Sequence, residues 1–139
     1  MTLRILATDH ISLFQRGNPG VVQRYSGFAA DELAVTAISV EEQMRGWLAA
    51  IRNSENPVQL TENYERLVRS VLYFNTITII PFDLTSYGIY DNFIAQRFRG
   101  GRQDLKIAAI ALSQNAILVT RNQRDFTSIP GLQLEDWSS

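Results

Sequence analysis

Short runs of apolar and β-branched residues alternate along the chain with longer segments in which apolar residues recur every three or four positions. The runs over residues 4–8, 33–38, 77–81 and 116–120 are typical of buried strands, and residues 132–135 are a candidate fifth. The segments between them have the periodicity of helices. Strands that alternate with helices predict a three-layer α/β/α sandwich around a mainly parallel sheet of four to five strands.

Turn and capping residues divide the helical segments. The sequence Gly17-Asn18-Pro19-Gly20 predicts a break between two short helices within residues 10–28. Ser39 and Glu42 have the spacing of a capping box, which predicts that a helix begins at Ser39. The remaining predicted boundaries are Asn56-Pro57, a helix end at Phe74, an N-cap at Asp83, the break at Gly100-Gly101 and a helix over residues 104–114.

The composition bounds the class of protein. With 139 residues, 45% hydrophobic and 19% charged, the chain predicts one globular domain over residues 1–139. Because it contains no cysteine, disulfides and thiolate zinc sites are excluded. No leader pattern opens the chain and no apolar run approaches about 18 residues, so we expect neither secretion nor membrane insertion. A cytoplasmic location is the expectation.

The basic residues are almost all arginines. The net charge of −1 gives no general attraction to nucleic acid, but only Lys106 among the 13 cations is a lysine. Arginine binds phosphate in a bidentate manner, and a compositional habit of the source genome explains the bias equally well. The arginines near the acidic residues in sequence are Arg45, Arg99, Arg102, Arg121 and Arg124.

Four acidic residues occupy positions where parallel sheets place their ligand sites. Asp9, Glu42, Asp104 and Asp125 each follow a predicted strand or begin a predicted helix. Such positions converge on one crevice at the carboxyl edge of the sheet. Several carboxylates in one crevice cannot all ionise cheaply without a cation. The pattern therefore predicts a Mg²⁺ or Mn²⁺ site.

Each residue also has a structural interpretation. Glu42 could satisfy a backbone N–H in the capping box, and Asp104 could cap or electrostatically favour its helix. Asp125 and Asn122 could be ordinary turn residues. His10, the only histidine, is more often a hydrogen-bonded structural residue than a catalyst. The shared location of the acids is what favours function.

From residue 4 to the C-terminus the chain resembles the PIN-domain ribonucleases, specifically the VapC-type toxins of toxin–antitoxin pairs. Four segments carry the resemblance: LATDHISLFQRGNP, TAISVEEQMRGW, GGRQDLKIAAIAL and LVTRNQRDFTSIPGLQLEDW. The resemblance implies a PIN-like fold and cleavage of RNA phosphodiester bonds that depends on Mg²⁺ or Mn²⁺. It assigns Glu42 and Asp104 to metal holding, and Asn122 and Asp125 to the positioning of water or metal. The metal would lower the pKa of bound water and offset charge on the phosphate.

The sequence departs from the family pattern at Ala7. The family's first metal-binding aspartate stands between a leucine and a threonine, where this chain has Leu6-Ala7-Thr8. Asp9 lies two residues after this position, so its carboxylate is not automatically a replacement for the missing ligand. We therefore expect the chain as written to be nearly inactive. Ala7 is either an engineered change that disables a toxic nuclease, which the otherwise intact motifs favour, or the mark of a natural degenerate member.

The resemblance also implies partners: an RNA substrate, a VapB-type antitoxin and a second copy in a homodimer, with DNA bound only through the antitoxin. Four aromatic residues are candidates for dimer or groove surfaces, although plain core is the commoner role for each: Trp47, Tyr87, Tyr90 and Phe98. The alternative function is a non-catalytic PIN-fold module that binds RNA or protein. Receiver domains and haloacid-dehalogenase-like phosphatases fit poorly, because the only lysine, Lys106, lies in the wrong element.

Overall fold

A computed structural model describes residues 2–139. Five strands alternate with helices in the predicted manner. The elements are β1 (Arg4–Leu6), α1 (Thr8–Gln15), α2 (Pro19–Ser26), η1 (Ala30–Glu32), β2 (Leu33–Thr36), α3 (Ala37–Arg52), α4 (Pro57–Phe74), β3 (Thr78–Ile80), α5 (Leu84–Ala95), α6 (Arg102–Ser113), β4 (Ile117–Val119), α7 (Gln123–Phe126) and β5 (Gln133–Glu135).

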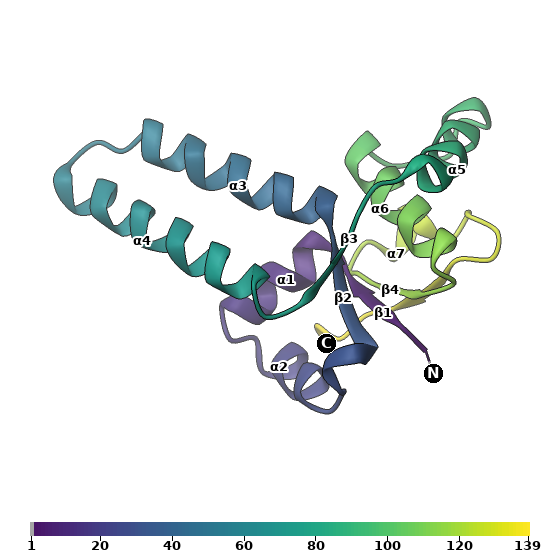
Figure 1. The fold of residues 1–139 in the computed structure, drawn as a ribbon, viewed down its shortest axis with the longest axis horizontal. Coiled ribbons are helices and arrows are strands. Elements are labelled where there is room, and N and C mark those ends of the chain that lie inside the picture. Colours follow the sequence, from purple (N-terminus) through teal and green to yellow (C-terminus); the bar gives the residue numbers. More distant parts are fainter. Residues whose placement is uncertain (1) are drawn as a thin grey trace.

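The five strands form one parallel sheet in the order β3-β2-β1-β4-β5. The strand β1 is central, with β2 on one side and β4 on the other (Figure 1). This order places the residues that follow β1, β2 and β4 at neighbouring points of the same sheet edge. The prediction of a mainly parallel sheet of four to five strands is confirmed, and the candidate strand at residues 132–135 is the edge strand β5.

Two apolar clusters on opposite faces of the sheet make the predicted three layers. Because side chains alternate along a strand, Ile5 packs on one face and Leu6 on the other. The cluster around Ile5 is completed by residues of α5 and α6, such as Phe93 and Ile107. The cluster around Leu6 is completed from α1, α2, α4 and the C-terminal segment. The strands are therefore covered on both faces, as parallel sheets usually are.

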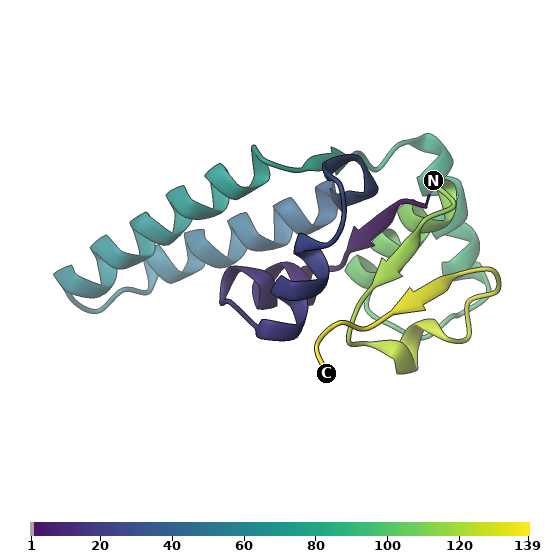
Figure 2. The same ribbon diagram turned by 90° about the horizontal axis from the view of Figure 1, so that it is seen from below.

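The helices α3 and α4 form an antiparallel pair that extends beyond the sheet as an arm, seen in both views (Figures 1 and 2). The pair is joined at its sheet-proximal half by Ser70, which donates to Gln43 Oε1 at 2.9 Å, and further out by Asn63, which donates to the Ala50 carbonyl at 3.2 Å. Asn56 caps α4 by accepting the N–H of Gln59, as its position before Pro57 indicates.

Several predicted boundaries were wrong by one or two residues, and the two that bear on the site lie at the carboxyl edge of the sheet. The first strand ends at Leu6, because Ala7 already begins the turn into α1. The helix predicted to begin at Ser39 is α3, and it begins two residues earlier, at Ala37. Thr36 caps it by accepting the N–H of Ser39 at 3.2 Å. A β-branched run that continues into a helix gives no internal signal of where the strand stops. Asp83 caps α5 as predicted.

Candidate active site

The structure brings the four predicted acids into one neighbourhood. Burial raises the pKa of the Asp104 carboxyl above its ordinary value, and the negative charges of Glu42, Asp9 and Asp125 raise it further. The amide of Asn122 acts in the opposite direction. Three carboxylates from three other segments that raise the pKa of Asp104 are the arrangement that convergence at the sheet edge predicts. We call Glu42, Asp104 and Asp125 the acidic crevice.

Glu42 points toward the end of β1 and does not cap its helix. Thr8 at the start of α1 donates its hydroxyl to Glu42 Oε1 at 2.7 Å, and the same hydroxyl lies 2.8 Å from Ser39 Oγ. The capping-box interpretation of Glu42 with Ser39 is therefore wrong, since Thr36 is the N-cap of α3. Without that structural role, Glu42 is a carboxylate held in place from a neighbouring element.

Asp104 lies in the first turn of α6, whose N-cap is Gly101 rather than Asp104. The first turn favours a carboxylate through the helix dipole, so part of the structural interpretation remains. The turn before α6, which contains Gly100, packs closely against Asp125. Gly100 has a φ of +113°, and a side chain there would sit 3.8 Å from the Asp125 Cβ. This is a backbone conformation that glycine tolerates far better than other residues.

Asn122 and Asp125 support one another in the turn after β4. Asn122 caps the short helix α7, and its Nδ2 donates to Asp125 Oδ2 at 3.1 Å. The Arg99 guanidinium lies 3.8 Å from the other Asp125 oxygen. Asn122 and Asp125 therefore shape the turn, as one interpretation predicted, and also lie beside Asp104, as the other predicted. The amide orients the carboxylate while the turn directs both toward Asp104.

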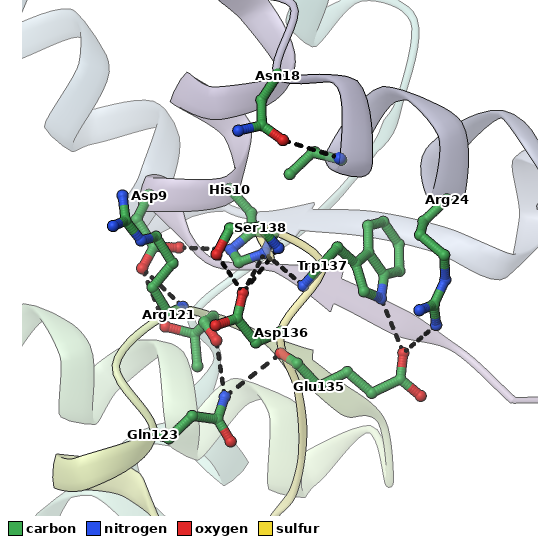
Figure 3. Close-up of polar contacts among 12 residues, drawn as sticks. Asp9, His10, Asn18, Arg24, Arg121, Gln123, Glu135, Asp136, Trp137 and Ser138 are labelled. Carbon is green, nitrogen blue, oxygen red and sulfur yellow. Dashed lines mark hydrogen bonds and ion pairs between the residues drawn. The ribbon is translucent and has the colours of Figure 1, made fainter.

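Both carboxylate oxygens of Asp9 form hydrogen bonds within the protein. Its Oδ2 accepts the Arg121 N–H at 3.0 Å and the Thr120 hydroxyl at 3.2 Å, and its Oδ1 lies 2.9 Å from His10 Nδ1 (Figure 3). These contacts join α1 to the segment that follows β4. A carboxylate with both oxygens engaged in this way is a poor substitute for the family's first metal-binding acid.

His10 is the fully buried centre of a C-terminal clamp, which we define as Asp9, His10, Glu135 and Trp137. The Trp137 backbone N–H donates to His10 Nε2 at 3.0 Å, so the ring's proton lies on Nδ1, toward Asp9. Asp136 Oδ1 lies 3.4 Å from the same Nε2. These contacts fix the last residues against α1 (Figure 3), which supports the structural interpretation of His10.

Glu135 completes the clamp on the other side of Trp137. Arg4 of β1 forms two hydrogen bonds of 3.0 Å to its two oxygens, and the Trp137 indole donates to Oε1 at 3.0 Å. Arg24 approaches the same oxygen at 3.6 Å (Figure 3). The bonds from Arg4 hold the pKa of Glu135 below its ordinary value. Burial alone would have raised it, so the paired charges outweigh desolvation here.

Ala7 occupies the N-cap position of α1 without a side-chain cap. Its own amide donates to Val119 O at 2.9 Å, and its carbonyl accepts from His10 and Ile11. Only 5% of its surface is exposed. Over residues 2–139, no three Asp, Glu, His or Cys side chains lie close enough together to hold a metal ion. The acids gather at one edge of the sheet, and position 7, which follows β1 there, carries no acid.

The other candidates have mixed outcomes. Arg45 pairs with the exposed Glu41 at 2.6 Å, whereas Arg99 is an ion-pair partner of Asp125. The aromatic candidates divide: Tyr90 is buried and Phe98 packs against the core, Tyr87 is 51% exposed, and Trp47 is partly buried and lines two surface grooves.

Two hydroxyl residues were missed as site residues. Thr8 holds Glu42, and Thr120 holds Asp9 while its hydroxyl also accepts the Asn122 N–H at 3.0 Å. Thr120 follows β4 directly and Thr8 follows β1 after one residue, and that position was the signal that could have identified them.

A parallel α/β/α sandwich with acids gathered at the carboxyl edge of β1, β2 and β4 defines a PIN-like fold. The chain is 31% identical to Ribonuclease VapC1 of Haemophilus influenzae strain R2866 over 137 residues, which are 96% of this chain and 97% of that one. It belongs to the VapC ribonuclease family. No family model matches it.

Solved structures agree with this fold. The structure of VapBC-1 from nontypeable Haemophilus influenzae matches with a TM-score of 0.77 and 26% identity, covering 99% of this chain and 100% of that one. DNA-bound VapBC from Salmonella typhimurium matches with a TM-score of 0.78 and 20% identity over 99% of both chains, which supports the fold alone. Among residues 2–139, no helix is long and apolar enough to cross a membrane.

Proposed function

We propose that this chain is a VapC-type endoribonuclease toxin whose first metal ligand is absent at position 7. The observation that carries the proposal is the crowding of Glu42, Asp9 and Asp125 around the partly buried Asp104, whose pKa is raised. A fold gains no stability from crowded, half-buried carboxylates, so their convergence favours a cation-binding role. Membership of the VapC ribonuclease family supports RNA as the substrate.

Mg²⁺ is the group that the family resemblance implies, and the residues present do not fit it fully. Glu42 and Asp104 offer oxygen ligands of the kind that Mg²⁺ prefers. Asp125 is already held by Asn122 and lies 3.8 Å from the Arg99 guanidinium. Asp9 is engaged by Thr120, Arg121 and His10. Over residues 2–139, no three such acidic side chains lie close enough together to hold a metal ion. With alanine at position 7, we therefore expect this chain to be nearly inactive.

In this proposal the chain's own residues still perform the preparatory work. Thr8 fixes the orientation of Glu42, and Asn122 fixes that of Asp125. Arg99, 3.8 Å from Asp125, carries a positive charge to the rim of the crevice, where an RNA phosphate would approach. A substitution that restores an acid at position 7 would therefore meet a crevice that is already ordered.

The matching solved structures are described as VapBC complexes, one of them bound to DNA. By analogy we propose that a VapB-type antitoxin masks this chain, that a second copy forms a homodimer with it, and that DNA is contacted only through the antitoxin. The arm of α3 and α4 carries exposed apolar residues such as Tyr64, Val68 and Leu72, which suit burial by a protein partner.

The test is RNA cleavage by the Ala7→Asp variant beside the unchanged chain, with Mg²⁺, with Mn²⁺ and with EDTA. We expect the variant to cleave roughly 10²- to 10⁴-fold faster than the unchanged chain, because a lost carboxylate ligand commonly costs several kcal/mol of transition-state stabilisation. EDTA should abolish the gain. A matched Ala7→Asn variant, which can cap α1 but carries no charge, should stay inactive.

The second candidate function is a non-catalytic module that binds RNA or protein, and Ala7 is the observation that favours it. Under that function the Ala7→Asp variant gains neither cleavage nor metal-dependent stabilisation. A rise in melting temperature with Mg²⁺ for Ala7→Asp, absent in the unchanged chain, would speak against the module even if the assay lacked the correct RNA. At 100 times the Kd, the ion should add about 2.7 kcal/mol to the free energy of unfolding.

A further inference from the structure

A groove lies between α1, α3 and the base of α4, and its character differs from the rest of the arm. It has a volume of about 310 Å³. Three exposed arginines line it, Arg16 at the end of α1 and Arg66 and Arg69 on α4, together with the partly buried Trp47 of α3. Three guanidinium groups around one indole form a local positive site on a chain whose net charge is −1.

The floor of this groove is polar and ordered. Gln43 is 8% exposed and exchanges two hydrogen bonds with Gln15, at 3.0 and 3.1 Å. It also accepts the Ser70 hydroxyl at 2.9 Å and donates to Ser12 Oγ at 3.3 Å. This network joins the three helices, so the walls that carry the arginines are held at a fixed separation before any ligand binds.

The groove adjoins a second hollow that reaches Glu42, one of the acids of the crevice. A second, smaller hollow is lined by Thr8 and Glu42, and it shares Ser12, Gln43 and Trp47 with the arginine groove. A chain-like ligand could therefore pass from the arginines, over Trp47, to the carboxylate of Glu42. The contacts of the arginines leave them available: Arg69 forms an exposed pair with Glu65 at 3.1 Å, and Arg66 bonds weakly to Asn63 at 3.4 Å.

We propose that this groove binds the single-stranded RNA that flanks the cleaved bond, with Arg16, Arg66 and Arg69 on backbone phosphates and Trp47 stacked on an unpaired base. The inference rests on the proposed function and adds where the strand lies. Arginines that follow a backbone, beside an aromatic face that receives bases, are how proteins bind single-stranded nucleic acid. Stacking on an indole tolerates any base, so the groove would set position more than sequence.

The chemistry of the groove favours a polyanion over a protein helix. The exposed apolar residues of α4, Tyr64, Val68 and Leu72, do not line it. A bound protein helix would be expected to cover such residues, whereas the groove offers cations, amides and hydroxyls. An acidic peptide shares the charge but not the stacking base, and it is the competing occupant that the test must exclude.

The experiment is a fluorescence-anisotropy titration of a labelled, unpaired 12-nucleotide RNA with the full chain in EDTA, which removes cleavage from the measurement. The double variant Arg66→Gln/Arg69→Gln should bind roughly tenfold more weakly. Its slope of log K against log salt should be shallower by about 1.4, because each lost phosphate contact on a single strand contributes about 0.7. Arg52→Gln/Arg97→Gln, which removes two exposed charges outside the groove, is the matched control and should change neither.

Trp47 separates the two occupants. Trp47→Ala should weaken RNA binding about 5- to 150-fold and Trp47→Phe much less, because a phenyl ring keeps the stacking surface. Binding of labelled polyglutamate by the unchanged chain, lost in the arginine variant while RNA binding persists, would overturn the proposal in favour of an acidic protein. Equal RNA binding by the groove and control variants would overturn the groove alone. Failure of the unchanged chain to bind RNA would count against both proposals.

Discussion

The acidic crevice and the C-terminal clamp lie close together, yet the pKa of Asp104 in the first is raised and the pKa of Glu135 in the second is lowered. In the clamp, two hydrogen bonds from Arg4 lower the pKa of Glu135. In the crevice, burial and three neighbouring acids raise the pKa of Asp104. Paired and satisfied acids stabilise the fold, whereas crowded acids cost stability and persist where a ligand compensates. The contrast distinguishes carboxylates that are paired within the fold from those that we propose to bind a cation more clearly than sequence position does.

The largest expected effect is on RNA cleavage, when a crevice acid is removed from the Ala7→Asp variant. In the Ala7→Asp background, Glu42→Gln should lower metal-dependent RNA cleavage about 10²- to 10⁴-fold, because the amide can still accept the Thr8 hydrogen bond but loses the charge. Urea unfolding should show little change in stability. Initial cleavage rates with saturating Mg²⁺ check the prediction, and an unchanged rate would remove Glu42 from the site.

The clamp should respond in the opposite way. His10→Ala should lower the free energy of unfolding by about 3 kcal/mol, because it leaves a cavity and strips the Trp137 N–H and Asp9 of a partner. Urea denaturation monitored by tryptophan fluorescence measures the loss. The exposed Gln96→Ala is the control and should change stability by less than about 0.5 kcal/mol. A stable His10→Ala would show that the clamp does not hold the C-terminus.

Glu135 sharpens the comparison through pH. Glu135→Gln should cost about 1–2 kcal/mol at pH 7, since it removes a charged, partly exposed pair with Arg4. Because the folded pKa of Glu135 is lowered, the ion pair contributes fully above the unfolded pKa and is lost as pH falls through the folded one. The two chains should therefore converge in stability in acid. A difference that grows on acidification would contradict the assigned direction.

The smallest expected change in the free energy of unfolding is at Asp104, and it is a gain in stability where Glu135→Gln gives a loss. Asp104→Asn should raise stability by about 0.5–1 kcal/mol at pH 7 by removing one crowded charge. Because the folded pKa is raised, the native state binds protons more readily, so the unchanged chain loses stability as pH rises through the window between the unfolded and folded pKa values. The gain should vanish below that window. A destabilised Asp104→Asn at neutral pH would mean that Asp104 serves mainly as a first-turn helix acid.

Much of the fold followed from local pattern. The apolar pattern located α1 to α6 and all five strands but neither η1 nor α7, and Asn56 and Asp83 cap their helices as their positions indicate. Ser39 and Glu42 show the limit: their spacing fits a capping box, but Thr36 competes for the same backbone groups and is the observed cap. A cap depends on where the preceding strand ends, and a continuous apolar run does not encode that locally.

The sequence by itself determined the element order, the family and the presence of alanine at position 7. Only the tertiary structure decided which acids are occupied: Asp9 is engaged by Thr120 and Arg121, more than one hundred positions away in the chain, while Glu42 is held by Thr8 from a different element. It also decided that Arg16 and Arg69 share a groove. Residue types and spacing specify local structure, but hydrogen-bond partners and local charge depend on segments that only folding brings together.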